Sequence, residues 1–354
     1  MKYIFLLSGD YIELAKEEVI SLFDVQKYDL LGNILIADLK NTKSLNKLSR
    51  RLALTKSIYR LLFECKVSEL TKLMKKYDWD CVYKTSFCLR VQCFDIDKKN
   101  IKKKFSEKDL SKYIWNSVQN PKVNLESPKT KIELFFIKGK AYCGLLTEEL
   151  KGDFESRKAH LRPFSHPSSL HPKLARALVN ITGIKENETL LDPFCGTGGF
   201  LIECGLMGIK VFGYDISKNM AKGCKENLKH FNIKNFKIIN KNALYINKKF
   251  DYVVTDLPYG LNSNVYLQCN KNSIQNKSNK INLKINRKNQ IKNIEKFYLK
   301  FLKNLRRKLK KKAVIIFPSY VNYKKLLKFA KFEIEKDFEI YMHRGLTRKI
   351  VKIR

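Results

Sequence analysis

The sequence predicts an α/β protein in two parts, an α+β N-terminal half followed by a C-terminal half with a parallel sheet. Two observations predict this division. Residues 1–150 contain strand-like and helix-like runs typical of small α+β units, whereas from residue 189 short apolar strands alternate with helices in repeated units. The length of 354 residues is enough for two or three domains, each with its own core.

Residues 1–65 predict a small α+β domain of ferredoxin type. The runs are strand-like KYIFLLS, helix-like DYIELAKEEVISLF, strand-like LLGNILIADL and a basic helix, NKLSRRLALTKSIYRLL. In the first helix, apolar residues recur at spacings of three and four, at Ile12, Ala15, Val19 and Leu22. Two strand–helix pairs in so short a stretch are typical of this class.

Residues 66–150 predict a second α+β unit. The runs TSFCLRVQCFDI and KIELFFIKGKAYCGLLT have the alternation and the aromatic and β-branched content of strands. Between them, SEKDLSKYIWNSVQN predicts a helix that begins after a serine and ends before Pro121. Residues 151–170 contain two prolines and two histidines without periodicity, which predicts an ordered linker.

Residues 171–354 predict a doubly wound unit with helices on both faces of a parallel sheet. It opens with the helix HPKLARALVNITG, which has Pro172 in its first turn and Gly183 as its stop. The strand-like runs that follow are TLLDPF, KVFGYDI, FKIIN, DYVVTDL and AVIIFPS, and the helical runs are GFLIECGLMG, SKNMAKGCKENLKHF and EKFYLKFLKNLRRKLKK. Residues 261–293 are rich in Asn, Lys, Ser and Ile and predict a flexible basic insertion. The last residues predict a β-hairpin.

The formal charge of +37 indicates a nucleic-acid partner, because 34 acidic residues do not balance 71 basic ones. The alternative is codon bias in a chain rich in Lys, Asn and Ile. Between residues 268 and 312, sixteen basic residues accompany one acid, Glu295, a density that favours contacts with phosphates over a merely solvated loop and helix.

The cysteine pattern and hydropathy exclude several other classes. Nine cysteines stand singly, without a CxxC pair or a Cys/His cluster, so we expect free thiols and no metal site. No apolar run approaches the about 18 residues of a membrane span, and the start is too briefly apolar for a secretory signal. The sequence predicts a cytoplasmic protein and leaves its oligomeric state open, with a monomer favoured.

The run LLDPFCGTGGF places Gly196, Gly198 and Gly199 in a strand-to-helix turn. Glycines there let the backbone approach a ligand closely. The spacing is neither GxGxxG nor a P-loop, so phosphates are not the obvious ligand. Asp215 follows at the end of the next strand, a position that suits two ribose hydroxyls. The alternative is a tight strand–helix connection without a ligand.

The run VVTDLPYG ends a buried strand with a carboxylate, Asp256, and stiffens the next turn with Pro258. An ordinary Pro-Tyr-Gly turn is the alternative.

Taken in order, DPFCGTGG, GYD and DLPYG resemble S-adenosylmethionine-dependent methyltransferases of the Rossmann-like class, and among them the amino-methyltransferases with an Asp/Asn-Pro-Pro-Tyr motif. The run PKVNLESPKTKIELFFIKGKAYCGLL resembles the end of a THUMP domain, an RNA-binding module of tRNA-modifying enzymes, so residues 66–150 are expected to form one. With RKAHLRPFSHPSSLHPKLARALVN and the terminal HRGLTR, the chain is similar to archaeal tRNA guanosine-10 N2-methyltransferases.

The resemblance implies S-adenosyl-L-methionine as methyl donor and assigns its contacts. Asp192 would hold the methionine amino group, and Asp215 the ribose hydroxyls. The loop that wraps the methionine part would include Cys195, Gly196 and Gly198, and the adenine would meet Ile216, Asn242 and Ala243. Asn242 stands where such enzymes often have an acid, and its amide oxygen can still accept a hydrogen bond.

The resemblance also implies how DLPYG would act on a guanine amino group. Asp256 and the Leu257 carbonyl would accept its two N–H bonds, Pro258 would keep that carbonyl aimed, and Tyr259 would stack on the flipped base. Leucine in place of the motif's first proline makes the choice of base less certain, since adenine N6 and cytosine N4 methylation use the same geometry.

Several basic residues are candidates for contact with tRNA. They are Arg162 and His166 before the second half, and His343, Arg344 and Arg348 near the end. The alternatives are an ordered linker and a solvated hairpin. The rival functions are an adenine or cytosine amino-methyltransferase on another RNA or DNA, and a non-catalytic RNA-binding protein.

Overall fold

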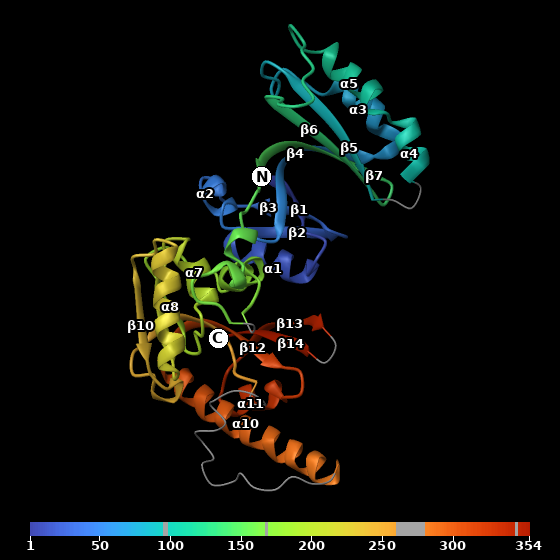
Figure 1. The fold of residues 1–354 in the computed structure, drawn as a ribbon. Helices are drawn as coiled ribbons and strands as arrows, with labels where there is room; N and C mark the ends of the chain where they lie inside the picture. Colours follow the sequence, from blue (N-terminus) through green and yellow to red (C-terminus); the bar gives the residue numbers. More distant parts are fainter. Residues whose placement is uncertain (95–97, 167–168, 260–279, 344–345) are drawn as a thin grey trace. The chain divides into compact units, whose positions relative to one another are not determined.

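The computed structural model divides the chain into two compact units (Figure 1). The residues that it describes are 1–94, 98–166, 169–259, 280–343 and 346–354. The first unit comprises residues 1–16, 23–50 and 54–151, and the second comprises residues 17–22, 51–53 and 152–354. Each unit is therefore assembled from separate stretches of the chain.

The first unit contains one seven-stranded sheet with the order β2-β3-β1-β4-β7-β6-β5. Its elements are β1 (Lys2–Leu7), α1 (Ile12–Leu22), β2 (Val25–Leu31), β3 (Ile34–Leu39), α2 (Leu45–Ser49), β4 (Thr55–Lys66), α3 (Leu70–Lys76), β5 (Phe87–Cys93), α4 (Lys98–Lys104), α5 (Glu107–Trp115), β6 (Thr130–Ile137) and β7 (Lys140–Glu149). Because β4 pairs with β1 on one side and β7 on the other, the sheet continues across the predicted boundary near residue 65. The ferredoxin-like and THUMP assignments stay predictions.

Two predicted elements of this unit are wrong. The basic run at 46–62 forms only the short helix α2 and then the central strand β4. There Ile58 and Tyr59 are buried and both strand edges are paired, so the sheet outweighs the local helical pattern. The run LLGNILIADL is a hairpin rather than one strand, since Gly32, with φ of 61°, turns the chain between β2 and β3.

The second unit contains a seven-stranded sheet with the order β10-β9-β8-β11-β12-β14-β13. Its elements are α6 (Pro172–Asn180), β8 (Thr189–Asp192), α7 (Gly199–Gly205), β9 (Lys210–Asp215), α8 (Lys218–His230), β10 (Phe236–Asn240), β11 (Phe250–Asp256), α10 (Lys280–Lys308), β12 (Leu309–Pro318), α11 (Tyr323–Phe329), β13 (Ile334–His343) and β14 (Leu346–Ile353). Strands β8 to β12 are parallel, and the terminal hairpin β13–β14 joins antiparallel to β12. The predicted alternation and the predicted hairpin are confirmed.

The structure describes only the last part of the predicted insertion at 261–293. Residues 260–279 lie outside the described part of the chain. From residue 280 the chain is helical rather than without structure, since α10 begins at Lys280. Its described part buries Ile294, Tyr298, Phe301 and Leu305 at spacings of three and four, which anchors the helix on the core.

In the second unit, residues 17–22 and 51–53 make buried polar contacts with the later part of the chain. Lys352, 6 % exposed, donates to Glu17 at 2.7 Å. Glu18 accepts hydrogen bonds from the Asn180 side chain at 2.7 Å and from the Ala53 backbone at 2.9 Å. These partners satisfy groups that would be costly to bury alone.

The sheet places three carboxylates at one edge. The parallel neighbours β9, β8 and β11 end at Asp215, Asp192 and Asp256. Between β8 and β11 the strand order reverses direction, which is the position where open α/β sheets form a ligand crevice.

Candidate active site

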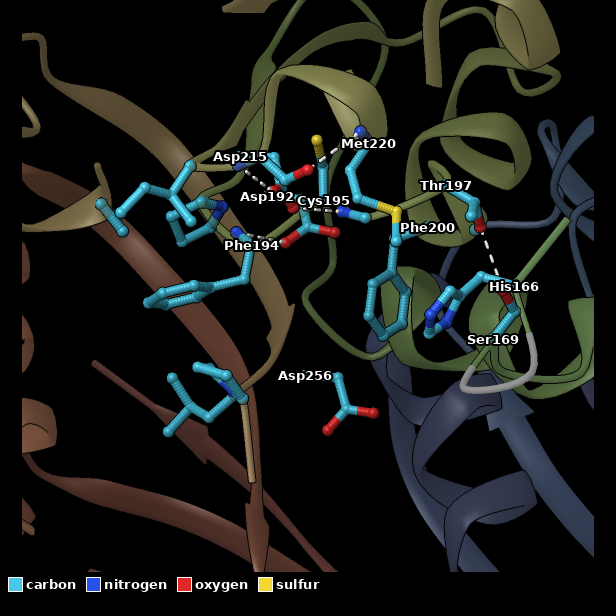
Figure 2. A pocket seen from close by; sticks show the side chains of 18 of the residues that line it. His166, Ser169, Asp192, Phe194, Cys195, Thr197, Phe200, Asp215, Met220 and Asp256 are labelled. Carbon is cyan, nitrogen blue, oxygen red and sulfur yellow. Dashed lines mark hydrogen bonds between the residues drawn. The ribbon is translucent and has the colours of Figure 1, made fainter. Parts of the chain in front are cut away.

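A cavity of about 480 Å³ opens at the carboxyl ends of β8, β9 and β11 (Figure 2). Its lining residues are His166, Ser169, Leu170, Asp192, Pro193, Phe194, Cys195, Gly196, Thr197, Gly199, Phe200, Asp215, Ile216, Ser217, Met220, Asn242, Ala243, Asp256, Leu257, Pro258, Tyr259, Phe297 and Arg348. All the residues predicted to bind the donor or act on the base line this cavity except Gly198, whose chain neighbours Thr197 and Gly199 do. Figure 2 shows Asp256 across the space from Asp192 and Asp215.

The glycine turn needs its glycines. Gly198 has φ of 87° and is the N-cap of α7, and a Cβ there would lie 2.8 Å from the Cys224 sulfur. Gly196 has φ of 50°. Both conformations favour glycine, and at Gly198 the close Cys224 sulfur also leaves no room for a side chain.

Asp215 ties the glycine turn to the end of β9. Its Oδ2 accepts the Gly196 N–H at 2.9 Å and its Oδ1 accepts the Ser217 N–H at 2.8 Å. Burial raises the pKa of this carboxyl, and the two N–H donors partly offset the rise. Each oxygen retains a second lone pair, which can accept a hydroxyl from a ligand.

Asp192 is the most deeply buried of the three carboxylates, at 2 % exposure. Its Oδ1 accepts the Phe194 N–H at 3.1 Å and the Thr255 hydroxyl at 2.7 Å. Burial raises the pKa of Asp192 to about 7, against the effect of these two donors and with a further rise from the charges of Asp215 and Asp256. A cation beside Asp192 would relieve that penalty.

The adenine-side predictions converge on the same cavity. Ile216, Asn242 and Ala243 all line it. The Asn242 side-chain oxygen accepts the Leu244 N–H at 2.9 Å and so starts the short 3₁₀ turn at Ala243–Tyr245. This hydrogen bond gives Asn242 a structural role as the N-cap of the turn. The second lone pair of the same oxygen is left for a contact with a ligand.

Asp256 lies in a triangle of hydrogen-bonding side chains. The Tyr259 hydroxyl donates to Asp256 Oδ1 at 2.8 Å and accepts from Arg348 Nε at 2.8 Å. Arg348 Nη2 lies 3.3 Å from Asp256 Oδ2. Burial raises the pKa of Asp256 to about 6, while Arg348 and the Tyr259 hydroxyl hold it lower than burial alone would.

The backbone of the motif is held as firmly as its side chains. The Leu257 N–H donates to the Ile316 carbonyl at 3.1 Å, a bond that proline at this position could not make. Tyr298 donates to the Pro258 carbonyl at 2.6 Å, and Tyr320 donates to the Tyr259 carbonyl. Leucine in place of the usual proline thus extends the pairing of β11 with β12 by one residue.

The Cys195 thiol, which lines the cavity, is not activated as a nucleophile. Contact with Cys224 and burial raise the pKa of the Cys195 thiol well above its ordinary value, which makes it a poor nucleophile. The described residues include no group of three His, Cys, Asp or Glu side chains that could hold a metal ion. No helix among the described residues could span a membrane.

The residues predicted to contact RNA do not form one surface in the described part of the chain. His166 lines the cavity. Arg162 is 5 % exposed, with its Nε donating to the Arg157 carbonyl, so the structure does not present it to a nucleic acid. His343 is the last residue of β13, and Arg344 lies outside the described residues. Arg348 points into the site rather than to a surface.

Several site residues were not predicted from the sequence. Phe297 lines the cavity from α10. Tyr298 of the same helix and Tyr320, which follows β12, donate hydrogen bonds to backbone carbonyls of the motif. Arg348 was noted only as a possible phosphate contact. An apolar helix pattern could have suggested a buried role for Phe297 and Tyr298, but no sequence signal links them to residues 256–259.

Comparison with known proteins agrees with this site. Residues 159–265 match the family model described as RMKL-like, methyltransferase domain. A tRNA (guanine(10)-N2)-dimethyltransferase of Methanothermobacter thermautotrophicus is 32 % identical over 366 residues, which cover 99 % of this chain and 98 % of the relative. A protein of the same name from Pyrococcus abyssi is 36 % identical over 202 residues, covering 55 % of this chain and 59 % of its own.

Among solved structures, TrmN from Thermus thermophilus aligns with a TM-score of 0.51 at 14 % identity and covers 100 % of this chain and 99 % of its own. A possible methylase from Clostridium difficile has the same TM-score at 15 % identity and covers 99 % and 97 %. At these identities the likeness concerns the fold, and it extends over both units.

Proposed function

Because this chain belongs to the tRNA (guanine(10)-N2)-dimethyltransferase family, we propose that it methylates the exocyclic N2 of a guanosine in tRNA, with S-adenosyl-L-methionine as methyl donor. The observation that carries the proposal is the convergence of three strand-end carboxylates and a glycine turn on one cavity. Position 10 and the formation of mono- or dimethylguanosine belong to this proposal, as does the cytoplasmic location predicted from the sequence.

The residues at the cavity fit the donor. Asp192 is a buried carboxylate for the ammonium group, and Asp215 presents two acceptor oxygens to the ribose hydroxyls. The turn from Cys195 to Gly198 allows close backbone approach to the methionine part, and Ile216, Asn242 and Ala243 would enclose the adenine. The donor, when bound, supplies a methyl group on a sulfonium sulfur that leaves as a neutral thioether.

The protein's part in the reaction is to orient a poor nucleophile. The guanine amino lone pair is delocalised into the ring. Asp256 and the Leu257 carbonyl accept its two N–H bonds, which draws the nitrogen toward tetrahedral geometry and turns the lone pair to the methyl carbon. The nitrogen–carbon bond forms as the carbon–sulfur bond breaks, and the amino proton is then lost. In this arrangement Asp256, hydrogen-bonded to the amino group, would accept it.

The fixed turn sets where the base must lie. Tyr298 and Tyr320 hold the carbonyls of Pro258 and Tyr259, so the motif does not reshape itself around the substrate. The base has to leave its helix to reach this point, and Tyr259 offers a face on which it can stack.

Helix α10 supports a polyanionic substrate. Its exposed side chains include a row of bases at spacings of three and four: Lys292, Lys296, Lys300, Lys303 and Arg307. The same helix contributes Phe297 to the cavity. We assign this row to RNA phosphates, with the N-terminal unit adding recognition by shape.

Asp215→Ala is expected to weaken binding of the donor about 5- to 150-fold, because about 1–3 kcal/mol of charged hydrogen bonds is lost. The maximal rate at saturating donor should change little, since Asp215 does not touch the base. Calorimetric titration with S-adenosylhomocysteine measures the change. An unchanged Kd in a variant that melts like the wild type would remove Asp215 from the ribose site.

The direct test of the function uses an unmodified tRNA transcript and methyl-labelled S-adenosylmethionine. We expect N2-methylguanosine or its dimethyl form at position 10, identified by nucleoside mass spectrometry and mapped by nuclease digestion. Label on adenine or cytosine would preserve the mechanism but overturn the substrate. If neither donor binding nor transfer occurred, a non-catalytic RNA-binding protein would be the better description.

A further inference from the structure

An arginine from the last strand of the chain lies inside the DLPYG motif. Arg348 is on β14, opposite Pro318 of β12, and is only 6 % exposed. One edge of its guanidinium reaches both members of the motif that have polar side chains: Nε donates to the Tyr259 hydroxyl, and Nη2 lies 3.3 Å from Asp256. The Tyr259 hydroxyl closes the triangle by donating to Asp256.

This placement is not that of an RNA contact. A guanidinium that binds phosphate has to be exposed, whereas the fork of Arg348 is already directed at a tyrosine oxygen and a carboxylate within the cavity wall. An isolated buried charge is strongly unfavourable, so the burial of Arg348 is stable only because partners such as Asp256 offset its cost.

The neighbours of Asp256 show what the charge does. On β8, Asp192 is a carboxylate whose own pKa is raised by the charge of Asp256, so it offers Asp256 no stabilising partner. From α10 and from the residues after β12, Tyr298 and Tyr320 bond the backbone of the turn rather than the carboxylate. Among the described residues, Arg348 is therefore the cation that offsets the burial of Asp256.

We propose that Arg348 is a positioning residue for methyl transfer, which keeps Asp256 ionised and holds it, with Tyr259, in the orientation that accepts the amino group of the target base. The inference rests on the proposed function. A protonated Asp256 would present an O–H donor where an acceptor is required, and a rotated Asp256 would leave one N–H of the amino group unpaired.

Charge and geometry can be separated by two substitutions. Arg348→Gln retains a side chain that can donate to Tyr259 but removes the charge. Arg348→Lys retains the charge but removes the fork that reaches two partners at once. The rate of a single turnover at saturating tRNA and donor is measured between about pH 5.5 and about pH 9 for each protein.

We expect the wild-type rate to fall on the acid side near pH 6, the pKa of Asp256. Arg348→Gln should move this acid limb upward by at least about one pH unit, lower the rate at neutral pH about 100-fold and recover part of it near pH 9. Arg348→Lys should leave the acid limb in place and lower the rate about tenfold at every pH. Dissociation constants for tRNA and S-adenosylhomocysteine should stay within about twofold.

Lys352→Met is the matched control. Lys352 is also a buried cation on β14, but it pairs with Glu17 and not with the motif. Its loss should lower the melting temperature without moving the acid limb. The proposal fails if Arg348→Gln keeps the wild-type limb, if Arg348→Lys keeps the wild-type rate, or if either variant loses tRNA affinity while transfer from bound complexes is normal.

A measurement without substrate separates this proposal from the proposed function. In donor-free protein labelled with carboxyl-¹³C aspartate, the Asp256 signal is identified by its absence in Asp256→Asn and titrated by NMR. A higher pKa in Arg348→Gln than in the wild type supports the role of Arg348 whatever the methyl acceptor is. An unchanged pKa overturns it, even if tRNA methylation is established. If Arg348→Gln does not fold, Arg348→Met, which also removes the charge, is titrated instead: a raised pKa supports the role of Arg348 and an unchanged one overturns it.

Discussion

We expect Asp256→Ala to lower the rate of methyl transfer about 10³-fold, while the affinities for tRNA and donor change less than about twofold. The size follows from the removal of a positioned charged acceptor, for which losses of about 10² to 10⁴ are typical. Binding should be spared because, in the proposed reaction, Asp256 meets only the amino group of the flipped base. Single-turnover kinetics at saturating substrates, with separate binding titrations, measure the two effects.

The control for this prediction lies on the same strand. Asp251 is in β11 with Asp256, but it accepts from Thr189 and Lys310 away from the cavity. Asp251→Ala should destabilise the protein modestly and keep the rate within a few-fold of the wild type. If Asp256→Ala reacted as fast as Asp251→Ala, the carboxylate would have no part in the reaction.

The second large effect concerns Asp192 and runs in opposite directions for binding and stability. Asp192→Asn should weaken donor binding at least about 100-fold at pH 8, because the ammonium group loses a buried charge partner. Wild-type affinity should fall about tenfold per pH unit below about pH 7, since the ammonium requires an ionised Asp192 whose pKa is about 7. In the variant this pH dependence should be absent.

The stability of the donor-free protein should change the other way. The pKa of Asp192 is raised in the folded state, so its favourable contribution is complete below the unfolded pKa and is lost as the pH rises through about 7. At pH 8 the wild type therefore carries a buried, uncompensated charge, and Asp192→Asn should melt a few degrees higher. A variant that both melted lower and bound the donor normally would contradict the assignment.

The parts of the site that the sequence predicts are those encoded locally. The glycine turn and the strand-ending acids each follow from a residue's own backbone or its position at the end of an apolar strand. Gly198 is an example, because its φ of 87° is a property of its own backbone. Parallel pairing then places Asp192, Asp215 and Asp256 together without further information.

The parts that the sequence does not predict depend on distant registers. Tyr298 and Arg348 reach the motif from 40 and 89 residues away, and the second contact exists only because β14 pairs with β12 in one register. A one-residue slip would turn Arg348 to the other face of the sheet. Strand β4 is a related case: its sequence has both a helical pattern and strand-forming residues such as Ile58 and Tyr59, and pairing with β1 and β7 decides between them.

The early segments of the second unit bear on how this protein can be divided. The sequence suggests a cut near residue 151, but residues 17–22 and 51–53 belong with the later part of the chain. A fragment from residue 152 onward would keep Lys352 and Asn180 while losing Glu17, Glu18 and Arg51, their hydrogen-bond partners. The methyltransferase half is therefore not an exchangeable module: recombination that joined it to another domain would have to bring replacements for these early residues as well.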